Sequence, residues 1–348
     1  MPDNLASERT LHISLTGGTG YVGSTLLQLI ATMPVNSVKV NALARSTSQL
    51  LAALGWTVLP SWLRVIEGRL PEVPGALFFD KPHVLVHFAV KQIDHDGSGF
   101  QQTNVEGTSA LLAKTNAHTS GVIYGSTLSV LGQGAQLAVT EQAPLYPQTD
   151  LAKSRAMAEA LCYEWATLQD KTAYGLRPRF ILGRNDRYVL PGLARLVEKN
   201  QSVGDGSQQF SVIAVEDYAR VILGLCRYMR SAAVREHTPV NVGYRESIRF
   251  RDLHYMLAQA LSVSTTSLTA IPTYRWLPWL MRRLPLKGIA QKATQLELIG
   301  FDHYADVKAL EERIGSDITG KPTRETVREI IRQWVVYSHG QDALASGG

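Results

Sequence analysis

The stretch LTGGTGYVGSTLLQLI (residues 15–30) constrains the fold more than any other part of the chain. Gly17, Gly20 and Gly23 follow an apolar segment and open a helical pattern. Glycine permits a tight turn and lets backbone N–H groups approach a pyrophosphate, and the last glycine lets the helix lie against the strand. The spacing is G-x-x-G-x-x-G rather than the usual G-x-G-x-x-G fingerprint. Because the motif joins a strand pattern to a helix pattern, we predict a dinucleotide-binding loop rather than an ordinary glycine turn.

Apolar runs typical of buried strands alternate with helical patterns through the first half of the chain. The expected strands are residues 11–17, 37–45, 62–68, 83–90, 121–131 and 171–182. The expected helices are residues 21–33, 104–117 and 150–168. This alternation predicts an α/β fold with a doubly wound parallel (Rossmann) sheet, which binds its ligand at the carboxyl ends of the strands.

Beyond residue 183 the alternation loosens, and amphipathic helical patterns cover residues 189–200, 250–261 and 323–337. We interpret this part as a smaller, mostly helical substrate lobe. The predicted organisation is an N-terminal tail (1–10), a Rossmann domain (11–182, with 210–243 woven back into it), a substrate lobe (183–209 and 244–337) and a flexible tail (338–348).

Composition and charge argue against a nucleic-acid-binding, membrane-spanning, secreted or metal-binding protein. The chain has 348 residues and a net charge of +5, but its Lys and Arg residues form no dense basic run, which argues against nucleic acid as a partner. It has no run of eighteen apolar residues and no apolar secretory core near residue 1. Two cysteines give no disulfide framework, and no His, Cys or Asp grouping has metal-ligand spacing, so we expect a cytoplasmic protein without a metal.

The end of the second expected strand bears on the choice of cofactor. A carboxylate there would accept hydrogen bonds from a ribose 2′-hydroxyl, whereas an arginine accommodates a 2′-phosphate. The sequence has Arg45 followed by Ser46, Thr47 and Ser48. A guanidinium group with neighbouring hydroxyls suits a phosphate, so we predict NADP(H) in preference to NAD(H). The alternative is a surface arginine in a polar loop.

Several further motifs follow in a fixed order: TGGTGYVG (16–23), HFAV (87–90), NVEGT (104–108), GSTLSVLG (125–132), PLYPQTDLAKSRAMAE (144–159) and LRPRFILG (176–183). As an ordered set they resemble the extended short-chain dehydrogenases/reductases, a group that includes sugar-nucleotide epimerases and dihydroflavonol-reductase-like enzymes. VNVG (240–243) and FDHYADVKALEERIG (301–315) resemble late segments of the 3β-hydroxysteroid-dehydrogenase-like branch. The resemblance covers about residues 11–335.

The resemblance implies a set of cofactor-binding residues. They are Gly17, Gly20, Tyr21, Val22, Gly23, Arg45, Ser46, Arg69, Leu70, Phe88, Ala89, Val90, Arg155, Pro178 and Arg179. The chain departs from the family pattern at four places. Val90 ends the H-x-A-[AG] box, Arg69 replaces an aspartate near adenine, and Leu182 and Arg184 replace the common Tyr and Pro of the sixth strand.

The catalytic helix of the family carries Y-x-x-x-K, and here these positions fall on Leu151 and Arg155. The family's catalytic Ser/Thr falls on Thr127, where it would hydrogen-bond a substrate oxygen. Leucine has no proton to give. Arg155 retains donors for the cofactor ribose, but its pKa prevents proton exchange. The resemblance therefore implies cofactor binding together with an atypical active site.

Three explanations of Leu151 are open. The first is an NADP(H)-dependent oxidoreductase that reduces a carbonyl or imine and takes its proton from Thr127, Tyr124, Tyr146, His95, the substrate or water. An iminium substrate would need no proton donor from the protein. The second is a cofactor-binding regulatory or scaffold protein without redox activity. The third is a redox-neutral isomerase, lyase or cyclase on the same fold. His87 fits a structural role better than a catalytic one.

The segment YRWLPWLMRRLPLKG (274–288) combines tryptophans and leucines with basic residues. It suits a lid over a hydrophobic or carrier-linked small-molecule substrate, a peripheral contact with a membrane surface, or a helix packed on the lobe. The resemblance also implies a homodimer through helices that flank the fourth and fifth strands.

Overall fold

A seven-stranded parallel sheet forms the centre of the computed structural model, which describes residues 10–94, 99–132, 134–231, 235–264, 269–274, 280–281, 283 and 289–345. The strand order is β12-β7-β5-β4-β1-β2-β3. The strands are β1 (Leu11–Thr16), β2 (Val38–Ala44), β3 (Leu63–Glu67), β4 (His83–His87), β5 (Thr119–Gly125), β7 (Thr172–Pro178) and β12 (His237–Val242). This order confirms the predicted doubly wound sheet, in which the chain crosses between β3 and β4 from one side of β1 to the other.

The two central strands are buried along their whole length. Every residue of β1 and of β4 is buried, and Ile13 of β1 pairs with Val40 of β2 and Val84 of β4. Strand β1 alternates apolar and polar residues (LHISLT), yet every position is buried, because the hydroxyl groups of Ser14 and Thr16 bond to the Leu77 carbonyl and to His87.

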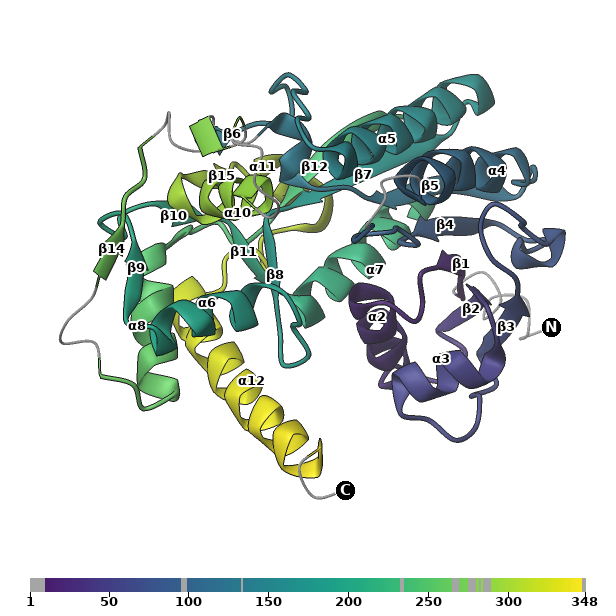
Figure 1. Ribbon diagram of the computed structural model, residues 1–348. Helices are drawn as coiled ribbons and strands as arrows, with labels where there is room; N and C mark the ends of the chain where they lie inside the picture. The colour runs from purple at the N-terminus through teal and green to yellow at the C-terminus, as the bar shows by residue number, and fades with distance from the viewer. Residues whose placement is uncertain are drawn as a thin grey trace.

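Helices cover both faces of this sheet. Figure 1 shows α4 and α5 on one side and α2 and α7 on the other. Their bounds are α2 (Tyr21–Ala31), α4 (Gly107–Ala113, which continues a π-helix over Phe100–Glu106), α5 (Asp150–Gln169) and α7 (Val215–Ser231). Helix α3 (Thr47–Leu54) was not predicted. Ser46 caps its start by accepting a hydrogen bond from the Gln49 N–H, and Gly55 ends it in a left-handed conformation.

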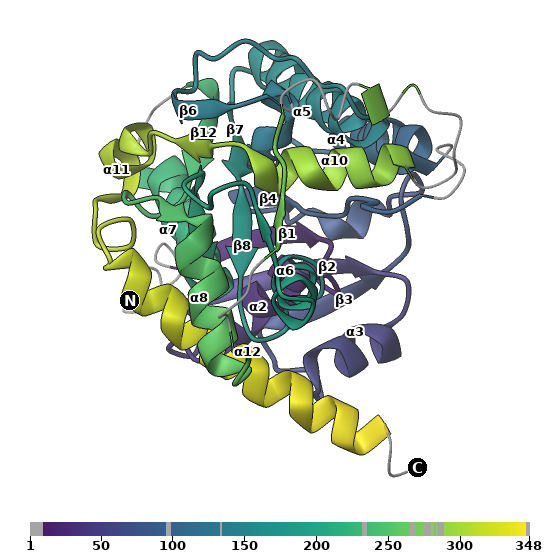
Figure 2. The ribbon, with the colours of Figure 1, turned by 60° about the vertical axis from the view of Figure 1, so that its left-hand side comes forward.

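The smaller lobe combines helices with short strands. Its helices are α6 (Val189–Glu198), α8 (Phe250–Ala260), α10 (Ile289–Gly300), α11 (Lys308–Ile314) and α12 (Thr323–Ala345), and Figure 2 shows α12 crossing α8. A four-stranded sheet joins β13 (Ile248–Arg249), β10 (Gln209–Phe210), β15 (His303–Ala305) and β6 (Gln136–Val139). Two-strand pairs join β8 (Phe180–Leu182) to β11 (Val212–Ala214) and β9 (Gln201–Val203) to β14 (Thr269–Ile271). Short 3-10 helices occur at Gly75–Leu77 and Leu128–Leu131.

The segment after residue 210 returns to the main sheet. Strand β12 pairs in parallel with β7, from His237 opposite Ala173 to Val242 opposite Pro178, and α7 packs against α2. At the other end, α12 continues to Ala345, past the end predicted at Tyr337, because Ala343, Leu344 and Ala345 are good helix formers.

Some predictions fall on residues that the structure does not describe. These are His95, nearly all of the N-terminal tail and most of the segment 274–288. Among the described residues, no helix combines the length and the apolar character needed to cross a membrane.

Candidate functional site

The glycine loop lies between the end of β1 and the first turn of α2. Gly17 has a φ of +79°, and a Cβ atom there would lie 2.5 Å from the carbonyl carbon of Phe88. A Cβ atom on Gly23 would lie 2.2 Å from the Gly17 oxygen. Gly20 is the N-cap of α2 and supplies no side-chain acceptor. The loop is therefore a close-fitting backbone turn whose first helical N–H groups have no side-chain cap.

His87 at the end of β4 links the glycine loop to the helix that follows β4. Its Nδ1 atom lies 2.6 Å from Thr16 Oγ1, and its Nε2 atom lies 2.9 Å from Thr108 Oγ1. Thr108 Oγ1 donates to the Asn104 carbonyl, so it accepts from His87 Nε2–H, and the hydrogen-bond network assigns this tautomer. Burial, together with the positive charge of Arg155, lowers the pKa of His87 to about 3. His87 is a neutral structural bridge, as the sequence suggested.

Asn104 connects the loop after β4 to the first turn of α5, the helix that corresponds to the family's catalytic helix. Its Oδ1 atom accepts from the Lys91 N–H at 2.8 Å, and its Nδ2 atom donates to Ser154 Oγ at 3.0 Å. Ser154 Oγ in turn donates to the Leu151 carbonyl at 2.9 Å. The first turn of α5 is thus fixed against the end of β4, with the Leu151 side chain half-buried on that turn.

Arg155, one turn further along α5, is buried at the end of β5. Its Nη2 atom donates to the carbonyl oxygens of Gly125 and Ser126, the latter at 2.9 Å, and its guanidinium lies 5.9 Å from the Tyr124 ring centroid. Its Nε atom is buried without a hydrogen-bond partner, as is Ser126 Oγ. Arg155 therefore braces the end of β5 and leaves one donor unused there.

The candidate proton donors lie in different environments. Thr127 is half-buried, and its hydroxyl oxygen accepts from the Ser129 N–H at 3.2 Å, which leaves its own hydrogen free to donate. Tyr124 is fully buried, and burial raises the pKa of its hydroxyl. Tyr146 is 67% exposed on a loop. Of these three described residues, only Thr127 combines partial exposure with a position at the end of β5.

The segment that follows β2 lies beside an acidic side chain that is distant from it in the sequence. Arg45 is exposed, while Ser46 caps α3. Thr47 donates from its N–H and its Oγ1 to one oxygen of Glu67, at 2.9 and 3.0 Å. These hydrogen bonds lower the pKa of Glu67. An ionised carboxylate therefore lies beside Thr47 in the segment that follows Arg45, because β3 pairs with β2 up to Ala44 and Glu67.

The remaining predicted cofactor residues are spread over several strand ends. Tyr21, Val22, Phe88, Ala89 and Val90 lie half-buried around the glycine loop and the end of β4. The Tyr21 hydroxyl is buried without a hydrogen-bond partner, and a Cβ atom on Gly183 would lie 2.6 Å from it.

Three further predicted cofactor-binding residues, Arg69, Leu70 and Arg179, contact other parts of the protein. Arg69 pairs with Glu72 at 3.5 Å on the surface, and Leu70 packs against Gly107. Arg179, which follows Pro178, donates to the Leu298 carbonyl at 2.8 Å and to Ser129 Oγ at 3.4 Å. Burial lowers the pKa of Arg179 to about 9. Arg179 thus ties β8 to α10 and to the Thr127 loop.

The sequence analysis missed one buried ion pair. Arg177 of β7 donates from Nε to Glu159 Oε2 at 3.2 Å and from Nη2 to Oε1. Both side chains are almost fully buried. The only signal was charged residues within otherwise apolar strand and helix patterns, and their partnership depends on how α5 crosses β7.

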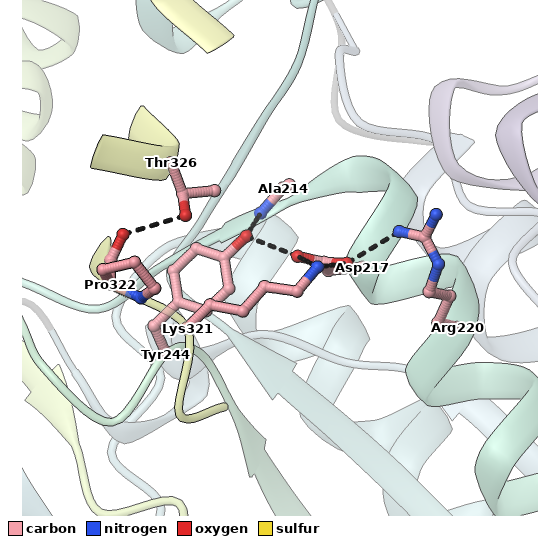
Figure 3. Close-up of polar contacts among 7 residues, drawn as sticks. All are labelled: Ala214, Asp217, Arg220, Tyr244, Lys321, Pro322 and Thr326. Atoms are coloured by element: carbon pink, nitrogen blue, oxygen red, sulfur yellow. Dashed lines mark hydrogen bonds and ion pairs between the residues drawn. The ribbon is translucent and has the colours of Figure 1, made fainter. Parts of the chain in front are cut away.

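A second missed cluster centres on Asp217 of α7 (Figure 3). Asp217 accepts from Lys321 Nζ at 2.6 and 2.8 Å, from Arg220 Nη1 at 2.7 Å and from the Tyr244 hydroxyl at 2.7 Å. The Tyr244 hydroxyl also accepts from the Ala214 N–H at 3.2 Å. Residues from three distant parts of the chain thereby fix the start of α7 against the smaller lobe.

The residues at the sheet's carboxyl edge fit a bound dinucleotide. Glycine at positions 17 and 23 lets the turn fold closely against Phe88 and against itself, as in the backbone turns that bind a pyrophosphate at a helix N-terminus. The uncapped N-terminus of α2 favours negative charge. The buried Arg155 Nε, which has no hydrogen-bond partner, adds a polar donor at the end of β5.

A sequence model of the NAD dependent epimerase/dehydratase family matches residues 13–243. The chain belongs to this family. Two curated relatives are similar over part of their length: a decarboxylating sterol-4-alpha-carboxylate 3-dehydrogenase of Candida albicans, 24% identical over 218 residues, and UDP-glucose 4-epimerase 4 of Oryza sativa, 27% identical over 229 residues. The matches cover 59% and 60% of this chain and 61% and 60% of these relatives.

Solved structures of the epimerase/dehydratase fold match nearly the whole chain. UDP-glucuronic acid 4-epimerase from Bacillus cereus, in complex with NAD, has a TM-score of 0.70 at 17% identity and covers 94% of this chain and 98% of its own. dTDP-glucose 4,6-dehydratase from Bacillus anthracis, also in complex with NAD, has a TM-score of 0.69 at 18% identity, with 95% and 97% covered. The fold and the predicted extended short-chain dehydrogenase/reductase type are confirmed, and the sterol dehydrogenase relative agrees with the predicted branch.

Proposed function

We propose that this chain is a nicotinamide-dinucleotide-dependent oxidoreductase that reduces a carbonyl or imine group of a small molecule. The observation that carries this proposal is the close-fitting glycine turn at Gly17 and Gly23, which leads into the uncapped N-terminus of α2. A nicotinamide cofactor bound there would supply the hydride. The hydride acceptor would lie near Thr127, whose hydroxyl retains a hydrogen for a substrate oxygen or nitrogen.

Leu151 sets the limits of the chemistry. It occupies the position of the family's tyrosine, has no proton to donate and makes this part of the site apolar. General acid–base assistance typically contributes about 10²–10⁴-fold, so its loss slows carbonyl reduction without preventing hydride transfer. The proton that carbonyl reduction needs would come from the substrate itself or from water, whereas reduction of an iminium carbon needs no proton. An apolar Leu151 also supports a hydrophobic or carrier-linked substrate, as does the sterol named for the Candida albicans relative.

Two residues of opposite charge bear on the form of the cofactor. Arg45 supports NADP(H), because a guanidinium group can hold a 2′-phosphate. Glu67 opposes it, because its ionised carboxylate uses the Thr47 N–H and hydroxyl that a phosphate would otherwise contact. The two solved relatives named above carry NAD. We retain NADP(H) as the preferred form, with Arg45 as the residue responsible.

Titration of the purified protein with NADPH and NADH tests the proposal. Enhanced nicotinamide fluorescence should saturate at one cofactor per chain, and a set of ketone and cyclic imine substrates should then oxidise the bound cofactor. No binding of either cofactor would contradict the proposal. Stoichiometric binding without cofactor oxidation for any substrate would favour a regulatory protein, and substrate conversion without net oxidation would favour an isomerase or lyase.

A further inference from the structure

A cavity lies between the loop 184–187, α6 and α12. Its volume is about 470 Å³, within the range of about 300–1,000 Å³ that small-molecule sites occupy. Arg184, Arg187 and Arg195 line it, together with the aromatic side chains of Trp334 and Tyr337. None of these residues belongs to the predicted cofactor set.

The cavity carries an excess of positive charge, because three exposed arginines line it together with two acids, Asp186 and Glu198. Within the described ranges, Arg184, Arg187 and Arg195 form no ion pair and no side-chain hydrogen bond. Glu198 also lines the cavity, but its carboxylate pairs with none of the three. Guanidinium groups repel one another around a shared cavity, and an anion would remove that repulsion.

The other acidic residue that lines the cavity, Asp186, uses its carboxylate to accept hydrogen bonds from backbone N–H groups. Its carboxylate accepts from the N–H groups of Tyr188, Val189 and Leu190, at 2.8, 3.0 and 3.0 Å, and so caps α6. Trp334 Nε1 donates to the Asp186 carbonyl at 3.1 Å. The loop that carries Arg184 and Arg187 is therefore held in place from both sides before any ligand binds.

We propose that this cavity binds a phosphorylated small molecule, with its phosphate on the three arginines and its apolar part against Leu261 and Trp334. Guanidinium groups bind phosphate oxygens in a bidentate manner, and aromatic walls accept a flat or apolar group. The inference does not depend on the proposed redox activity.

Calorimetric titration with inorganic pyrophosphate tests the site. Compared with wild type, the double variant Arg184→Gln/Arg195→Gln should bind pyrophosphate about tenfold more weakly or worse, because it loses two charged hydrogen-bond donors. Arg332→Gln on α12 removes the same charge from a surface pair outside the cavity and should leave the affinity unchanged. Thermal unfolding checks that both variants are folded, and NADPH titration checks that the glycine loop is intact.

Two further measurements decide the assignment. If the double variant binds pyrophosphate as wild type does, or if Gly23→Ala in the glycine turn removes the binding instead, the anion lies elsewhere and the proposal is overturned. Uridine monophosphate should bind more tightly than inorganic phosphate, and Trp334→Leu should abolish that difference. Equal affinity of the nucleotide and inorganic phosphate for wild type would overturn the contact with the aromatic wall.

Discussion

The guanidinium group of Arg177 and the carboxylate of Glu159 form an ion pair between β7 and α5, with side-chain exposures of only 3% and 1%. Removing one partner leaves a buried charge without compensation. We expect Glu159→Ala to lower the free energy of unfolding by about 3–5 kcal/mol, as measured by urea denaturation.

Two controls separate this effect from the loss of a surface charge. The double variant Arg177→Met/Glu159→Met should be less destabilised than Glu159→Ala, because it leaves no unpaired charge. Asp150→Ala removes an exposed pair with Lys153 on the same helix and should cost under about 1 kcal/mol. A double variant as unstable as the single one would show that packing, and not charge, dominates.

The neutral state of His87 predicts a dependence of stability on pH. Its pKa is lowered from 6.5 to about 3 in the folded protein, so between these values the unfolded chain binds a proton that the folded chain does not. The contribution of His87 is fully present above pH 6.5 and declines as the pH falls, by roughly 1.4 kcal/mol per pH unit. His87→Gln should reduce the slope of unfolding free energy against pH by about one proton. Identical slopes for the two proteins would contradict a neutral His87.

Gly23 tests whether the glycine turn holds a cofactor. A Cβ atom there would meet the Gly17 oxygen at 2.2 Å, so Gly23→Ala should displace the turn and weaken NADPH binding by more than about tenfold. Gly192→Ala in α6 is the matched control, since nothing lies within 4 Å of its Cβ position. The control should bind normally and gain up to about 1 kcal/mol of stability, because alanine favours a helix. Normal binding by Gly23→Ala would rule the turn out as the pyrophosphate site.

Arg45 and Glu67 should change cofactor preference in opposite directions. Arg45→Asp should weaken NADPH about tenfold or more and leave NADH nearly unchanged, because only NADPH carries the 2′-phosphate. Glu67→Gln removes the neighbouring negative charge and should strengthen NADPH relative to NADH. Dissociation constants from fluorescence titration give both ratios. An equal loss of both cofactors in Arg45→Asp would contradict a role in recognising the 2′-phosphate.

Thr127 should act on the substrate and not on the cofactor. Thr127→Val keeps the shape but removes the hydroxyl, and should lower kcat/KM by about a hundredfold with an unchanged NADPH dissociation constant. Thr127→Ser should restore most of the activity, because it retains the donor. A matching loss of NADPH affinity in Thr127→Val would assign the residue to the cofactor instead.

The sheet could be predicted from the sequence because its signals are local. LHISLT and HVLVH are rich in leucine, isoleucine and valine and are buried throughout, and the glycine turn marks where β1 ends. Helix α3 was missed because its cap, Ser46, was interpreted as a phosphate ligand. The polar serines and threonines of that segment suit a helix cap and a phosphate contact alike, and the Gln49 N–H that donates to Ser46 Oγ shows the cap.

The candidate site was only partly predictable. The positions of Leu151 and Arg155 followed from motif spacing, but spacing does not reveal that Arg155 donates to the Gly125 and Ser126 carbonyls. Glu67 reaches Thr47 through strand pairing. Arg177 meets Glu159 through the crossing of a helix over a strand. Such contacts depend on tertiary geometry, which one sequence does not specify.

The Asp217 cluster has a consequence for how the protein is made. Asp217 lies 104 residues before Lys321, one of the two cations that neutralise it. A chain emerging from the ribosome therefore completes α7, which packs on α2, while a buried carboxylate still lacks half of its positive charge. The lobe that carries the main sheet therefore reaches its final stability only after Lys321 has been synthesised, so maturation of the two lobes is tied to the order of translation.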